Sequence, residues 1–119
     1  MGRTALGRWL GIAAAALLVL PAAAHGAVAS VTCPDGVRAH KQRPVVLLVH
    51  GTATTAQESW AEGFGKSLHV SGFDWCMVQL PGRALGDIQA SNAYVVDAVG
   101  DLHRLTHRRI ALALSLIHI

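Results

Sequence analysis

The sequence predicts an α/β fold in which crossover helices connect the strands of a parallel sheet. Three short apolar runs of strand length occur at 44–49, 75–80 and 110–114. Two segments with the apolar spacing of helices separate these runs. Strands that alternate with helices are typical of parallel sheets, because a crossover helix returns the chain to the edge where each strand begins.

Residues 1–29 have the order of a secretory signal peptide. Arg3 and Arg8 supply a basic start, residues 10–20 hold no charge, and small residues then lead to a cleavage site. Pro21 interrupts the apolar stretch, which therefore falls short of the roughly 20 apolar residues of a membrane helix. We expect a cleaved leader and an extracellular protein; the alternative is an uncleaved membrane anchor.

The charge of the chain gives little support to a nucleic-acid partner. The net charge is +3 at pH 7, but without residues 1–29 eight Lys and Arg face seven Asp and Glu. Beyond the adjacent pair Arg108 and Arg109 there is no basic cluster. Proteins that bind nucleic acid have a basic stripe or patch, so we expect no nucleic-acid partner.

The mature chain is predicted to begin with a loop and a buried strand. Residues 30–43 contain the turn-forming sequence Pro-Asp-Gly and have no strand periodicity. Residues 44–49 form a continuous apolar run with three valines. Such a run is typical of a parallel strand that is buried on both faces.

The first helix is predicted from the four-residue spacing of Trp60, Phe64 and Leu68, which would share one face. Ser59 and Glu62 have the spacing of a capping box near its start. A serine-glycine pair follows the apolar face and would end the helix before the second strand at 75–80.

The second helix is predicted to begin at Asp87, whose carboxylate suits an N-cap. Arg104, Arg108 and Arg109 would lie near its carboxyl end, where the helix dipole favours cations. The third strand, 110–114, follows directly. The predicted apolar face consists of Ile88, Val95, Val99, Leu102 and Leu105.

The sequence His-Gly-Thr at 50–52 directly follows the first predicted strand. In serine hydrolases the loop after an early strand supplies a backbone donor to the oxyanion hole. Gly51 allows a sharp turn, and Thr52 offers both an N–H and a hydroxyl to a developing negative charge. A tight turn without a chemical role is the alternative interpretation.

Several residues match the residue types and spacing of a known family. Gly-Thr-Ala-Thr-Thr at 51–55 corresponds to a Gly-Thr-Gly-Thr-Thr loop, and Cys76 follows the loop glycine by 25 residues. Asp-Ile-Gln at 87–89 matches an Asp-x-Gln, and Tyr94 matches an aromatic residue that opens a helix. Through these residues the region from Cys33 to Val99 resembles the lipase-B type of secreted α/β-hydrolases and related bacterial lipases. Two residues depart from the family pattern, namely Ala53 in place of a glycine and His50 in place of a proline.

The resemblance implies that residues 30–114 are the N-terminal part of an α/β-hydrolase domain. It implies hydrolysis of lipid-like or other carboxylic esters by serine acyl transfer, with transient contact to a lipid interface and without a metal or organic cofactor. Thr52 would be an oxyanion-hole residue. The substrate-binding residues would be Gly51, Thr52, Asp87 and Gln89.

The two cysteines, Cys33 and Cys76, are expected to form a disulfide, as an even pair does in an exported protein. The resemblance implies the same pairing. His103 and His107 lie four residues apart on the second predicted helix, a spacing that can hold zinc. The glutamate that zinc hydrolases place between such histidines is absent, so we expect two surface histidines and no metal site.

A hydrolase of this class needs a Gly-x-Ser-x-Gly nucleophile elbow, then an Asp or Glu and a His. Ser115 follows the third strand but has no glycine beside it, so we expect that it is not the nucleophile. Residues 115–119 depart from the family pattern and are interpreted as a non-native tail. The chain as given is therefore expected to be an inactive fragment of a secreted ester hydrolase, either a lipase or a relative of the cutinase or acyltransferase kind. The alternative is a small exported binding or envelope protein without catalytic activity.

Overall fold

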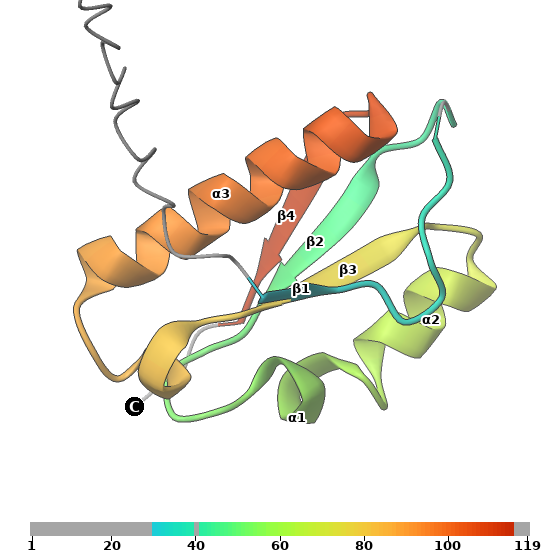
Figure 1. Cartoon of the computed structure of the whole chain (residues 1–119). Helices are drawn as coiled ribbons and strands as arrows, with labels where there is room; N and C mark the ends of the chain where they lie inside the picture. Colours follow the sequence, from blue (N-terminus) through green and yellow to red (C-terminus); the bar gives the residue numbers. More distant parts are fainter. Residues whose placement is uncertain (1–29, 40, 116–119) are drawn as a thin grey trace, which may run out of the picture.

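The computed structural model describes residues 30–39 and 41–115. These residues form one four-stranded sheet with helices on both faces (Figure 1). The strand order is β1-β3-β2-β4. The predicted leader, 1–29, and the part of the predicted tail at 116–119 lie outside the described residues.

The three predicted strands are confirmed as the parallel part of the sheet. They are β2 (Val45–Val49), β3 (Trp75–Gln79) and β4 (Ile110–Leu114), and β2 pairs in parallel with both others. Every residue of β2 is buried, because strands flank it on both sides and helices cover both faces. The carboxyl ends of the three strands therefore meet at one edge of the sheet.

The sheet as a whole is mixed, because β1 (Ser30–Thr32) pairs antiparallel with β3. The prediction of a loop throughout 30–43 is wrong for these first three residues. Val31 lies opposite Val78, so the edge strand is held by backbone pairing to a strand 47 residues further along the chain. Three residues are too few to produce a recognisable alternating pattern.

The single helix predicted around Trp60 is two short helices, α1 (Ala56–Trp60) and α2 (Phe64–Val70). The capping box is also formed by a different pair. Thr55 Oγ1 accepts from Glu58 N–H at 3.2 Å, and Glu58 Oε2 accepts from Thr55 N–H at 2.8 Å. Thr55 and Glu58 have the same three-residue spacing as the predicted pair, Ser59 and Glu62, which lies four residues later. The hydrogen bonds from Thr55, assisted by the charge of Arg83, hold the pKa of Glu58 below its usual value.

The α2 helix packs against the sheet through a glycine. A Cβ atom on Gly65 would lie 2.5 Å from the ring of Trp75, so this close approach requires a residue without a side chain. The Trp75 indole N–H donates to Asp35 Oδ2 at 2.8 Å. The core on the α1 and α2 face of the sheet consists of Val46, Leu48, Ala56, Trp75 and Met77.

The α3 helix (Ile88–Thr106) covers the opposite face, and its predicted N-cap is confirmed. The Asp87 carboxylate accepts from Gln89 N–H at 2.7 Å. Of the predicted apolar face, Leu102 is buried, but Ile88 and Leu105 are 82% and 65% exposed. A helix of 19 residues is about 28 Å long and a five-residue strand about 17 Å, so α3 is longer than the strands that it covers. No helix among the described residues is long and apolar enough to span a membrane.

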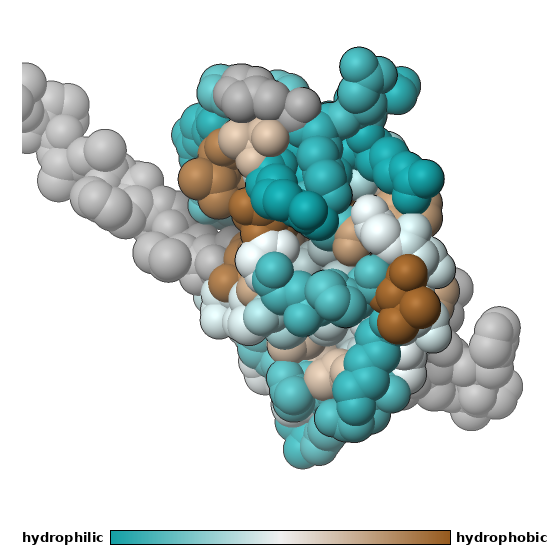
Figure 2. Space-filling model, turned by 90° about the vertical axis from the view of Figure 1, so that its right-hand side faces the viewer, coloured by the Kyte–Doolittle hydropathy of each residue, from teal (hydrophilic) through white to brown (hydrophobic). Residues whose placement is uncertain are grey.

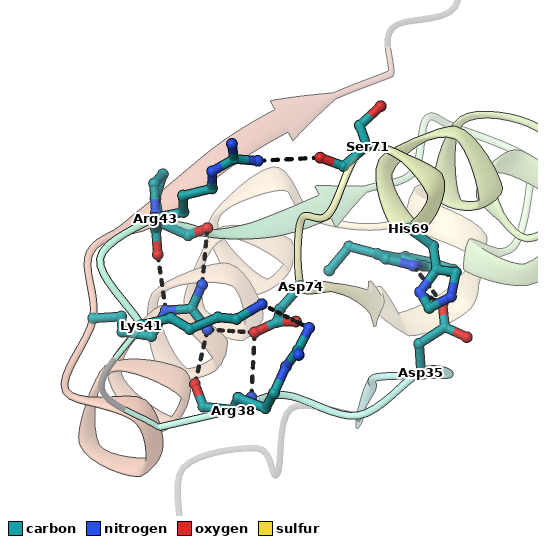
Figure 3. Close-up of polar contacts among 10 residues, drawn as sticks. Asp35, Arg38, Lys41, Arg43, His69, Ser71 and Asp74 are labelled. Carbon is teal, nitrogen blue, oxygen red and sulfur yellow. Dashed lines mark hydrogen bonds and ion pairs between the residues drawn. The ribbon is translucent and has the colours of Figure 1, made fainter.

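Arg108 is not the exposed helix-end cation that the sequence predicts. It is buried and donates from Nη1 to Asp74 Oδ2 at 2.5 Å. Figure 3 shows Arg38 and Lys41 also directed at Asp74, with distances to its carboxylate of 3.2 and 3.9 Å. Burial raises the pKa of Asp74, but the hydrogen bonds of Arg108 and Arg38 and the charge of Lys41 outweigh it and lower the pKa to about 2.

The side of the molecule on which α2 and the loop before β2 lie is largely hydrophilic (Figure 2). Apolar residues occur there in small separate patches. Single exposed apolar residues are normal on a protein surface, and the described residues on this side form no extended apolar patch.

The predicted disulfide between Cys33 and Cys76 is present and closes a separation of 43 residues. It joins the loop after β1 to a fully buried position on β3. Disulfides persist in oxidising compartments, so this bond agrees with an extracellular or otherwise oxidising environment.

Candidate active site

A pocket of about 450 Å³ lies where the carboxyl ends of β2 and β4 meet the start of α3. The residues after parallel strands commonly form binding sites, because the strands present several loops at one edge. The wall is mostly apolar, with Val49, Leu80, Ala84, Ile88 and Leu114, and its polar side chains are His50, Thr52, Ser91 and Ser115.

The predicted oxyanion loop lies at this pocket, and both Gly51 and Thr52 line it. Gly51 is buried and Thr52 is exposed to the pocket. The carbonyl of Gly51 accepts two hydrogen bonds, from His50 Nδ1 at 2.9 Å and from the Thr54 hydroxyl at 3.0 Å. The loop is therefore held by its own side chains next to Thr52.

Ala53, which stands where the resembling family has a glycine, has a φ of 64°. This is the left-handed region, which glycine adopts without a steric penalty and alanine does not. The Ala53 N–H donates to the carbonyl of Arg83 at 2.8 Å. That bond fastens the loop to η1 (Pro81–Ala84), the short 3₁₀ helix after β3. The backbone shape of the loop is thus the one a glycine favours, with alanine in its place.

His50 is 2% exposed and both of its ring nitrogens have partners. Nε2 accepts from the backbone N–H of Leu80 at 2.9 Å, so Nε2 carries no proton. A neutral imidazole then carries its proton on Nδ1, which donates to the Gly51 carbonyl. With both nitrogens engaged, His50 has no free lone pair with which to act as a general base in this arrangement.

Gln79 links this histidine to the start of α1. Its Nε2 lies 3.1 Å from His50 Nε2 and 3.1 Å from the carbonyl of Leu80, while its Oε1 accepts from Ala56 N–H at 2.9 Å. Neither His50 nor Gln79 is among the site residues that the sequence predicts. A signal was present, because each is a polar residue at the carboxyl end of a buried strand.

Asp87 and Gln89 are not among the residues that line the pocket. Their neighbours Gly86 and Ile88 do line it, so the predicted pair lies beside the pocket. The Asp87 carboxylate is engaged in capping α3. Their role as substrate-binding residues stays a prediction.

Ser115 lies in the same pocket as Thr52. Its backbone N–H donates to the carbonyl of Val49 at 2.9 Å, which extends the pairing of β4 with β2 by one residue. The position immediately after β4 therefore lines the same pocket as the loop after β2. That Ser115 itself is not a nucleophile stays a prediction.

His103 lies in the last turn of α3, and His107 is the C-cap of that helix. His103 Nδ1 lies 2.9 Å from the carbonyl of Arg108, and the backbone N–H of His107 donates to the carbonyl of His103 at 2.8 Å. Within residues 30–39 and 41–115, no three or more His, Cys, Asp or Glu residues are grouped as metal ligands.

A scan against protein-family models finds no match to this chain, and a search of curated proteins finds no significant match.

Proposed function

We propose that this chain is the N-terminal part of a secreted α/β-hydrolase that hydrolyses lipid-like carboxylic esters by serine acyl transfer. The observation that carries the proposal is the position of Thr52. It follows the buried strand β2, lies in the turn of Thr52 and Ala53, and lines a pocket at the carboxyl ends of the parallel strands. That is where an oxyanion donor is needed in this class of enzyme.

The chemistry of the pocket suits an ester with an apolar acyl group. Attack on the ester carbonyl places negative charge on one oxygen, and the N–H and hydroxyl of Thr52 are donors available to that charge. Val49, Leu80 and Leu114 supply an apolar wall beside them. Apolar pockets with a few convergent polar groups are typical of small-molecule sites.

The proposal requires a nucleophile on the other side of the pocket. Because β4 pairs in parallel with β2, Ser115, directly after β4, lines the same pocket as the loop that follows β2. We propose that the nucleophile elbow follows β4 in the complete enzyme, and that the base and acid come from later segments. The disulfide supports the secreted location. The chain of 119 residues is expected to be inactive.

The test compares Thr52→Ala with Thr52→Ser in the complete enzyme proposed above, the one that carries a nucleophile elbow after β4. The substrate is a short-chain p-nitrophenyl ester. Removal of the hydroxyl is expected to lower kcat by about 10²-fold or more, whereas serine retains a donor and most of the activity. Equal kcat values for the alanine variant and the wild type would contradict the role of Thr52. Absence of ester hydrolysis by the wild-type enzyme would contradict the proposed function itself.

A further inference from the structure

We propose that His50, as the neutral tautomer with its proton on Nδ1, is the positioning residue that orients the backbone N–H of Thr52 toward the pocket. The catalytic consequence rests on the proposed function. The structural part rests on contacts of His50 that involve no substrate.

One peptide group connects the contacts of His50 to the N–H of Thr52. The carbonyl of Gly51 and the N–H of Thr52 belong to the same peptide unit, which is planar and trans, so the two bonds point in opposite directions. Whatever fixes the carbonyl of Gly51 also fixes the N–H of Thr52. His50 Nδ1 and the Thr54 hydroxyl, at 2.9 and 3.0 Å, hold that carbonyl on one side of the loop.

The His50 ring is itself fixed to a neighbouring strand. Its Nε2 accepts from Leu80 N–H, the first backbone N–H after β3, at 2.9 Å. The ring thus bridges the loop after β2 and the end of β3, and at 2% exposure it does so out of contact with bulk water. Buried polar networks of this kind keep a single arrangement only while every donor and acceptor is satisfied.

Gln79 holds the other end of the same loop. Its Oε1 accepts from Ala56 N–H at the first residue of α1, and its Nε2 contacts both His50 Nε2 and the carbonyl of Leu80. The loop between β2 and α1 is therefore fastened to the end of β3 at both of its ends. Ala53 N–H adds a third attachment, to Arg83 of η1. An oxyanion donor acts most effectively when it is fixed before the charge develops.

The two ring nitrogens have separate roles, which two substitutions can separate. In His50→Asn the amide nitrogen lies near the position of Nδ1 and retains a donor for Gly51. In His50→Gln the longer side chain reaches the position of Nε2 and retains an acceptor for Leu80, but not the donor. His50→Ala removes both. If orientation of the Gly51 carbonyl is what matters, asparagine and glutamine differ in catalysis although each retains one contact.

The first measurement is the ¹⁵N NMR spectrum of the His50 ring in the full wild-type chain at neutral pH. The expected result is a protonated Nδ1 and an unprotonated Nε2. The opposite tautomer would overturn the proposal. Because this measurement needs neither substrate nor variant, it decides the structural part even if the substitutions prevent folding or the enzyme proposal fails.

The second measurement is kcat and KM of the three variants, made in the complete enzyme proposed above. We expect His50→Ala and His50→Gln to lower kcat by about 10²-fold, as misplacement of a catalytic group does, with smaller changes in KM. We expect His50→Asn to recover most of kcat. Equal losses for asparagine and glutamine, or losses confined to KM, would overturn the positioning role. Failure of the proposed function is distinguishable, because wild-type activity would then be absent while the tautomer remained as expected.

Discussion

Asp74 and Arg108 form a buried ion pair with 2.5 Å between Asp74 Oδ2 and Arg108 Nη1. Asp74 directly precedes β3 and Arg108 lies two residues before β4, so the pair joins the amino-terminal ends of two parallel strands. The guanidinium also donates to the carbonyls of Arg38 and Arg43 at 2.8 Å. At the amino-terminal ends of the strands, Arg108 thus joins the residue before β3 to the connection between β1 and β2.

Arg108→Met is expected to destabilise the fold by about 3–5 kcal/mol, because it leaves the buried Asp74 carboxylate without its closest partner. Arg104→Met is the matched control, since Arg104 pairs with Asp101 on the exposed surface of α3. Arg104→Met is expected to lower the free energy of unfolding by about 1 kcal/mol or less. Urea denaturation gives both values, and similar losses in the two variants would contradict the structural role of Arg108.

The stability of the fold is expected to fall at acid pH because of Asp74. Its pKa is lowered from an ordinary 3.8 to about 2 in the folded state, so the unfolded chain binds the proton more readily. The stabilisation is therefore complete above the ordinary pKa and is lost as the pH falls toward 2. It amounts to about 2 kcal/mol.

This pH dependence can be assigned with Asp74→Asn. Urea midpoints measured between pH 5 and pH 2 should decline more steeply in the wild type than in the variant, which has no carboxylate to titrate at that position. If the two curves are parallel, a group other than Asp74 causes the loss of stability at acid pH.

Gly65→Ala is expected to destabilise the fold by about 1–3 kcal/mol, because its new methyl group would meet the Trp75 ring. Gly100→Ala in α3 is the control, since a Cβ there meets nothing within 4 Å. Alanine is favoured over glycine inside a helix by about 0.5–1 kcal/mol, so this variant should gain stability. Thermal unfolding of the two variants should therefore shift in opposite directions, and a gain for Gly65→Ala would contradict the packing of α2 on Trp75.

Ala53→Gly is expected to be neutral or to stabilise the fold by up to about 1 kcal/mol. It relieves a left-handed backbone at φ 64° but increases the freedom of the unfolded chain. Ala53→Val should destabilise, because a β-branched residue fits that region poorly. Thermal unfolding of the two variants measures both effects. A valine variant as stable as the wild type would argue against the left-handed turn.

The parts of the fold that follow from local pattern were predictable. The buried run at 44–49 corresponds to β2, and Asp87 caps α3 as its position suggests. The loop with Gly51 and Thr52 was predicted to form part of a site, and both residues line the pocket. Each of these features depends on residues that are neighbours in sequence.

The features that were missed depend on distant residues. Arg108 was assigned to a helix end by its local charge, whereas its partner Asp74 lies 34 residues away. The ring of His50 is held by the backbone N–H of Leu80, 30 residues further along the chain. β1 is defined only by its pairing with β3. Periodicity and capping rules describe one element at a time, so they do not reveal contacts that form only when elements pack together.

The most direct test of the central claim is an independent read of the gene from a clean template, from codon 110 to the stop codon. The proposed function predicts that Gly-x-Ser-x-Gly follows β4 within a few residues, with an Asp or Glu and a His encoded later. The same five residues at 115–119 followed by a stop codon, in a chain that folds as a stable monomer, would contradict it and favour a non-catalytic exported protein.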